Sequence, residues 1–239
     1  MLLTSECLSL RTFVALGTVL LGTFVLACGS SPSSPSPMPS PGGPVPPQRV
    51  DRAAVIDALD YGQADAGISC ELLEESVEPR LLIRSGTDGL GSQGGGRGLI
   101  DGVFPENNQA RSGLVVIEPG GGQYCRQGTA WCRYLYRHEI GHALGFLDHS
   151  TEGLMFKTPD SLNDRERRMI KTLYSLPHGA QVNVNGTWAV ASTGASGTIA
   201  DLQAARDVIP WNMHSTVGAS YRTRGVTTRW ELPVRVYID

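Results

Sequence analysis

The segment of residues 138–149, with the sequence HEIGHALGFLDH, constrains the fold more than any other part of the chain. On a helix, side chains four residues apart lie on the same face, so His138 and His142 can offer imidazole nitrogens to one metal ion. Zinc suits such ligands. Glu139 follows the first histidine and can accept a proton from a water molecule held by the metal. The segment therefore predicts a helix that carries a zinc site and a general base.

The residues that follow resemble a known family pattern. Gly145 comes three residues after His142, and Met155 follows a short connection, as in the metzincin zinc metallopeptidases. The resemblance is to bacterial matrixin-like and snapalysin-like members and covers residues 80–176. It implies an α/β (α+β) fold, with a small twisted mixed sheet, an active-site helix and a C-terminal helix below the zinc. It also implies a methionine turn at Met155.

The resemblance leaves two alternatives for the third zinc ligand. Asp148 lies ten residues after His138, at the place of the third ligand in the family, and snapalysin-like members have aspartate there. We therefore prefer Asp148, since a carboxylate is an accepted zinc ligand. His149 is the alternative, because one extra residue in the turn after Gly145 would bring its imidazole to the metal, as in matrixins.

The function implied by the resemblance is zinc-dependent endopeptidase activity on extracellular or envelope proteins. Residues 99–104 would then form the edge strand on which an extended peptide substrate pairs, or else an interior strand without that role. A catalytically inactive, lipid-anchored binding or adhesion module with the same fold is the alternative, and the intact Glu139 argues against it. The formal net charge of −3 and the lack of a basic run predict no nucleic-acid partner.

The N-terminal region predicts export. Arg11 precedes an apolar stretch that ends at Ala27, which is typical of a signal peptide over residues 1–27. Residues 25–28 resemble the lipobox of bacterial lipoproteins, so Cys28 would carry lipid; an ordinary secretory peptide or plain membrane anchor is the alternative. Residues 28–49 are rich in Ser, Pro and Gly and predict a tether. The expected location is the cell envelope, outside the cytoplasm and attached to the membrane by lipid, or the exterior if secreted.

Three further cysteines remain after Cys7 in the leader and Cys28 are set aside. Cys125 and Cys132 are close in sequence and are the pair we expect to form a disulfide in an oxidising compartment, which leaves Cys70 free. Three buried thiols are the alternative.

Hydrophobic spacing and turn residues divide the rest of the chain into a catalytic domain at residues 50–180 and a C-terminal extension at 181–239. Helices are expected at residues 50–61, at 130–144 with Thr129 as N-cap, and from Ser161 with Asp164 as its capping partner. Strands are expected at residues 81–84, 99–104, 114–117, 182–191 and 229–238, with a mobile glycine-rich loop at 86–98. Residues 192–228 give no clear prediction.

The order of these elements is unusual for the family. Metzincins begin with a strand, whereas here the tether leads almost directly into a helix. Residues 229–238 resemble that opening strand. We therefore hypothesise a permuted arrangement in which residues 234–238 join the sheet beside residues 81–84.

Overall fold

The computed structural model describes residues 49–239 except 91–93, 157–158, 160 and 215–224. The expected signal peptide, Cys28 and all but one residue of the tether therefore lie outside the described residues. Among the helices that the structure describes, none has the length and apolar character needed to cross a membrane.

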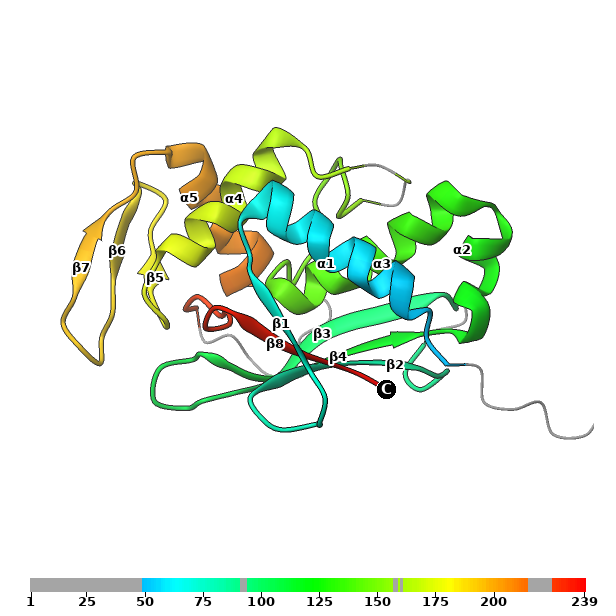
Figure 1. Ribbon diagram of the computed structural model, residues 1–239. Helices are drawn as coiled ribbons and strands as arrows, with labels where there is room; N and C mark the ends of the chain where they lie inside the picture. Colours follow the sequence, from blue (N-terminus) through cyan, green and yellow to red (C-terminus); the bar gives the residue numbers. More distant parts are fainter. Residues whose placement is uncertain (1–48, 91–93, 157–158, 160, 215–224) are drawn as a thin grey trace, which may run out of the picture. The chain divides into compact units, whose positions relative to one another are not determined.

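The main sheet is mixed and has five strands, with helices on one face (Figure 1). Neighbouring strands are parallel in three of the four strand pairs, and the pair at one edge of the sheet is antiparallel. The α/β class with a mixed sheet is thereby confirmed. In spatial order the strands are β1 (Cys70–Leu73), β8 (Val234–Ile238), β2 (Arg80–Ser85), β4 (Ala110–Ile117) and β3 (Gly96–Val103).

The C-terminal strand β8 lies inside the sheet, between β1 and β2 (Figure 1). Its register pairs Val236 with Leu81 and Ile238 with Ile83, both parallel. The hypothesis that residues 234–238 join the sheet beside residues 81–84 is confirmed. Strand β1, on the other side of β8, was not expected from the sequence. The C-terminal extension thus contributes a strand to the sheet of the preceding domain.

Helix α3 (Thr129–Leu144) lies against β3 and β4, with α1 (Arg52–Ala66) packed beside it. Helix α4 (Asp164–Ser175) contacts α1 and α5 (Leu202–Val208). Helix α1 begins and ends later than the expected 50–61, and the N-caps expected for α3 and α4 were both wrong. Thr129 is the first residue of α3, after an N-cap at Gly128 that has no side-chain bond.

The N-cap of α4 is Asn163, and the predicted pair of Ser161 and Asp164 was wrong. The Asn163 side chain accepts the Glu166 N–H, and the Glu166 carboxylate accepts the Asn163 N–H. A reciprocal pair of this kind satisfies two donors that the helix leaves open, so the helix begins at Asp164.

The extension also forms smaller elements. The single strand expected at residues 182–191 is two short strands, because Gly186, at a φ of 81°, allows the chain to turn between them. The short elements of the extension are β5 (Gln181–Val182), β6 (Thr187–Ala189), β7 (Ser196–Thr198) and the π-helix η2 (Ile209–Met213). Two further short elements, η1 (Pro119–Gly121) and α2 (Gly122–Arg126), precede α3.

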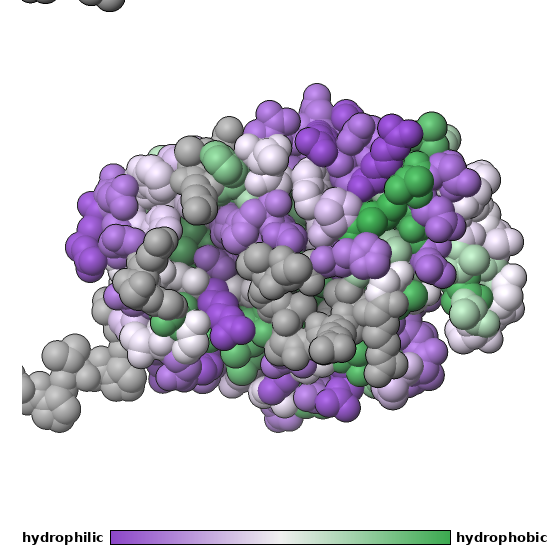
Figure 2. Space-filling view, turned by 180° about the vertical axis from the view of Figure 1, so that it is seen from behind, coloured by the Kyte–Doolittle hydropathy of each residue, from purple (hydrophilic) through white to green (hydrophobic). Residues whose placement is uncertain are grey.

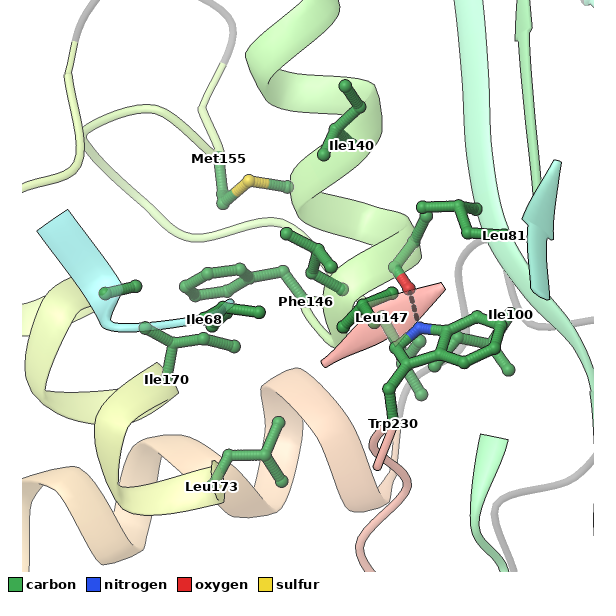
Figure 3. Packing of buried hydrophobic residues seen from close by; sticks show 14 of the residues in the cluster. Ile68, Leu81, Ile100, Ile140, Phe146, Leu147, Met155, Ile170, Leu173 and Trp230 are labelled. Carbon is green, nitrogen blue, oxygen red and sulfur yellow. Dashed lines mark hydrogen bonds between the residues drawn. The ribbon is translucent and has the colours of Figure 1, made fainter. Parts of the chain in front are cut away.

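The core fills the space between the helices and the sheet (Figure 3). Trp230 is 2% exposed and donates its indole N–H to the Ala143 carbonyl of α3 at 2.7 Å, which satisfies the only polar atom of a large apolar side chain. On the face shown in Figure 2, polar and apolar side chains are interspersed.

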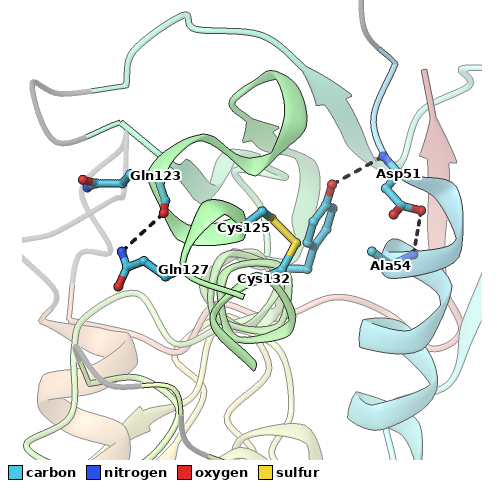
Figure 4. Close-up of a disulfide and its surroundings, with 7 residues drawn as sticks. Asp51, Ala54, Gln123, Cys125, Gln127 and Cys132 are labelled. Atoms are coloured by element: carbon cyan, nitrogen blue, oxygen red, sulfur yellow. Dashed lines mark hydrogen bonds between the residues drawn. A yellow bond between two sulfur atoms is a disulfide. The ribbon is translucent and has the colours of Figure 1, made fainter. Parts of the chain in front are cut away.

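A disulfide links Cys125 of α2 to Cys132 of α3, as expected (Figure 4). It ties the short helix to the start of the helix that bears the histidine motif. Cys70 is the free cysteine among residues 49–239 that the structure describes. Burial raises the pKa of its thiol to about 11, so this thiol is protonated at neutral pH.

Candidate metal centre

His138 and His142 lie on one buried face of α3, as their spacing predicts. Their exposed fractions are 6% and 5%, and their Nε2 atoms are 3.2 Å apart. The two ring planes are perpendicular, with centroids separated by 4.7 Å. The two imidazoles therefore direct nitrogens into the same small volume.

His149 completes the cluster. Its ring stacks on His138 with centroids 5.3 Å apart and meets the edge of His142 at 4.8 Å. One ligand nitrogen from each of the three residues lies within 4.8 Å of the other two. Three imidazole nitrogens are thus available to one ion.

Asp148, the preferred third ligand from the sequence, does not belong to this group. Its Oδ1 accepts the backbone N–H of His149 at 2.7 Å, so its carboxylate caps the local turn. The chain leaves α3 at Gly145, which has a φ of 133°, and the Phe146 N–H bonds to the Gly141 carbonyl; from this turn it is His149 that reaches the cluster. The structure therefore favours His149 over Asp148.

Backbone carbonyls orient the first two histidines. Nδ1 of His138 lies 2.8 Å from the Leu154 carbonyl oxygen, and Nδ1 of His142 lies 2.5 Å from that of Phe146. A carbonyl oxygen only accepts, so each Nδ1 carries the hydrogen and each Nε2 has its lone pair directed at the cluster. This is the tautomer that a metal ion needs.

Burial also keeps both rings neutral. It lowers the pKa of His138 to about 4 and that of His142 well below its ordinary value. Neutral, pre-oriented imidazoles are ready to bind a cation without first losing a proton. Three histidine nitrogens form a donor set that fits zinc, with a fourth position left for water or substrate. The residues present therefore fit the metal that the sequence implies.

Glu139 is buried beside the cluster, with an exposed fraction of 8%. Burial raises the pKa of its carboxyl to about 8, while a hydrogen bond with the Gly98 backbone acts in the opposite direction. The carboxyl is thus able to hold or release a proton near neutral pH.

Strand β3 approaches Glu139 closely because the two residues that lie against it, Gly96 and Gly98, are glycines. A Cβ atom on Gly98 would lie 1.7 Å from the Glu139 carbonyl oxygen, and one on Gly96 would lie 2.6 Å from Glu139 Cγ. Any side chain at Gly98 would push the strand away from the helix. This requirement explains why β3 begins inside the glycine-rich segment that was expected to be a mobile loop.

Met155 lies under the same helix turn. Its side chain is fully buried, and a Cβ on Gly141 would lie 2.7 Å from its sulfur. Figure 3 shows the Met155 side chain directed at α3. The structure thus brings together His138, Glu139, His142 and Met155 of the predicted site.

Sequence reasoning missed Glu166 and Asn212, two buried polar residues that support this site. Glu166 had one detectable signal, since Asn163 and Glu166 have the spacing of a capping box. Asn212 had none, because it contacts the site from the region without a clear prediction.

Comparison of the chain with protein-family models, with curated proteins and with solved structures found no match in any of the three. The geometry of the metal centre is therefore the basis of the function proposed below.

Proposed function

We propose that the chain is a zinc-dependent endopeptidase that hydrolyses peptide bonds of extracellular or envelope proteins. The observation that carries the proposal is the convergence of three imidazole nitrogens beside the buried Glu139. His138, His142 and His149 would hold the zinc ion. When bound, zinc polarises a substrate carbonyl and lowers the pKa of water.

Glu139 supplies the acid–base chemistry. Its carboxylate takes the proton of the attacking water and then donates that proton to the leaving amine nitrogen. Burial raises the pKa of this carboxyl in the metal-free protein, and the same desolvation favours its protonated form between these two steps. His138 and His142 are held as neutral ligands by their carbonyl partners.

Strand β3 supports a peptide as the substrate. It lies at one end of the strand order and pairs only with β4 within the part of the chain that the structure describes. An extended peptide can add to such an edge through backbone hydrogen bonds. Because Gly98 contacts Glu139, a strand bound along this edge would lie near the general base.

Activity measurements on purified protein without residues 1–28 test the proposal. We expect about one zinc per chain, cleavage of a peptide library, and loss of cleavage on chelation that added zinc reverses. Glu139→Ala should lower kcat by about 100-fold or more, since general base catalysis contributes that much. Glu106→Ala, an exposed carboxylate in the β3–β4 turn, is the matched control and should keep full activity.

Two results would contradict the proposal. Cleavage that survives complete metal removal would exclude a zinc peptidase. Zinc binding without cleavage of any peptide in the library would favour the inactive binding module instead.

We further propose that the chain is exported and anchored by lipid on Cys28. The Cys125–Cys132 disulfide supports an oxidising compartment, because disulfides are rare in the cytosol. Metabolic labelling with a radioactive fatty acid tests the anchor: Cys28→Ala should abolish labelling, and Cys7→Ala should retain it. Label retained in Cys28→Ala would exclude this anchor.

A further inference from the structure

The turn that follows α3 is held by residues from the C-terminal extension. The Leu147 N–H donates to the Trp211 carbonyl at 2.8 Å, and the Asn212 side-chain amide donates to the Gly145 carbonyl at 2.8 Å. These bonds come from η2, more than sixty residues further along the chain. They fix the backbone between the second and third histidines of the cluster.

The hydrogen bond from Leu147 to Trp211 involves a peptide unit that also contacts His142. The Phe146 carbonyl, which accepts the bond from His142 Nδ1, and the Leu147 N–H belong to the same planar peptide unit. A rotation of this unit would break both hydrogen bonds together. The Trp211 carbonyl therefore helps to set the orientation of the His142 ring, and hydrogen bonds in such a series strengthen one another.

Asn212 holds the preceding peptide unit. Its side chain is completely buried, and its amide nitrogen donates to the carbonyls of Gly145 and Thr228 at 2.8 and 2.7 Å. Its Oδ1 accepts the Thr228 N–H at 2.8 Å. All three bonds go to backbone groups, so the amide connects the end of α3 to the segment that leads into Trp230.

Asn212 bonds to Gly145, which has an unusual backbone conformation. Gly145 has a φ of 133°, a value that residues with a side chain rarely adopt, and from there the chain turns back to deliver His149. A buried carbonyl without a donor is costly, so loss of the Asn212 amide would favour a rearranged turn. The three-histidine geometry depends on this turn.

We infer that Asn212 is a positioning residue of the metal centre, which acts through the backbone of residues 145–147 on His142 and His149. The inference rests on the metal site of the proposed function and assigns the C-terminal extension a part in it. Groups that orient metal ligands from outside typically change metal affinity by about 10- to 100-fold when they are removed.

The zinc Kd of the folded protein, measured by competition with a chromophoric chelator, tests this role. Asn212→Ala should raise the Kd by about 10- to 100-fold. Val182→Ala is the matched control, because Val182 is a buried residue of the same extension, 4% exposed, in the separate sheet formed by β5, β6 and β7. It should lower the thermal midpoint of the metal-free protein while its Kd stays within about twofold of the parent value.

Equal zinc affinity in Asn212→Ala and the parent protein, with only the thermal midpoint reduced, would overturn the inference. If Asn212→Ala does not fold, Asn212→Asp provides the second variant, since it keeps the shape and the acceptor for the Thr228 N–H but removes the amide that donates to the Gly145 and Thr228 carbonyls. It should show the same loss of affinity, and an unchanged Kd in this variant would also overturn the inference.

Hydrogen exchange of the unmodified protein gives an independent measurement. If the extension and the metal centre are coupled, zinc should slow exchange in residues 211–213 and leave residues 187–189 of β6 unaffected, because coupling between two sites is reciprocal. No slowing in residues 211–213 would overturn the inference. Failure of the parent protein to bind zinc at all would instead contradict the proposed function, so the two failures are distinguishable.

Discussion

Nδ1 of His138 lies 2.8 Å from the carbonyl oxygen of Leu154, so the loop that carries Met155 also orients the first histidine of the cluster. That loop is itself held by Glu166 of α4, whose carboxylate accepts the N–H groups of Leu154 and Met155 at 3.0 and 2.8 Å. The carboxylate also accepts the Ser150 hydroxyl at 2.7 Å. A buried acidic side chain thus links the capping of α4 to the geometry of the metal site.

Glu166→Gln is expected to destabilise the protein. Each carboxylate oxygen of Glu166 accepts two hydrogen bonds, so either orientation of a glutamine amide would place its NH₂ group against two donors. Leaving such buried donors unsatisfied should lower the free energy of unfolding by about 2–4 kcal/mol. Urea unfolding followed by circular dichroism measures the change.

Asp164→Asn, an exposed position in the first turn of α4, is the control for this substitution. It removes one surface ion pair with Arg167 and should change stability by less than about 0.5 kcal/mol. Similar stability of Glu166→Gln and Asp164→Asn would contradict the role assigned to Glu166.

The two candidates for the third ligand make opposite predictions for metal affinity. His149→Ala removes a nitrogen of the cluster and should weaken zinc binding on the order of 100-fold or more, whereas Asp148→Ala should weaken it by less than about tenfold. Asp148 has only the smaller effect because its Oδ1 bonds to the His149 backbone. The reverse ranking in a chelator competition would restore Asp148 as the ligand.

Glu139→Gln should stabilise the metal-free protein at high pH. Burial raises the folded-state pKa of Glu139 to about 8, above its unfolded value. The stability contributed by the protonated Glu139 carboxyl is therefore fully present below the pKa that this carboxyl has in the unfolded chain. It is lost as the pH rises through the folded-state pKa of about 8. At pH 8 the neutral amide should make the free energy of unfolding larger than that of the parent by on the order of 4 kcal/mol, with little difference near pH 4.5.

Urea unfolding in the presence of a chelator, at several pH values, measures this difference. His138 and His142 titrate in both proteins, so their contributions largely cancel in the comparison. Glu106→Gln, at an exposed site, should follow the parent at every pH. A Glu139→Gln curve parallel to that of the parent would show that the carboxyl is not desolvated.

Gly98→Ala should separate β3 from α3. The added Cβ would lie 1.7 Å from the Glu139 carbonyl oxygen, a backbone atom that cannot move without distorting the helix. We expect a loss of about 1–3 kcal/mol in unfolding free energy together with reduced peptidase activity. Gly62→Ala is a control of opposite sign, since its Cβ would make an ordinary contact at 3.7 Å and alanine favours a helix interior by about 0.5–1 kcal/mol. Equal stability of the two variants would contradict the close approach.

The sequence predicted those parts of the site that depend on local spacing. His138, Glu139 and His142 are set by helix geometry, and Cys125 and Cys132 are close enough in sequence to be paired by proximity. The turn after Gly145 was not predictable in detail, because its path depends on Trp211 and Asn212. That dependence is why the preferred ligand from the sequence was Asp148 and the structure presents His149.

The strands of the sheet also divide into those that local spacing predicts and those that depend on distant partners. Strands β2 and β4 were expected from their short apolar runs, and the structure buries these residues in the core. The place of β8 was inferred from the unusual order of elements, whereas β1 and β7 were not predicted and β5 and β6 were expected as one continuous strand. Short strands are defined by their partners, and partners distant in sequence cannot be identified from local spacing.

The position of β8 also has a consequence for the order of assembly. Strands β1 and β2 are separated by a short connection, yet they do not pair, because β8 from the far end of the chain lies between them. The sheet cannot close until residues 234–238 have been synthesised, and contacts over such long sequence separations form slowly. Under the export proposed above, a sheet that stays open until residues 234–238 arrive would keep the chain unfolded for passage through a translocation channel.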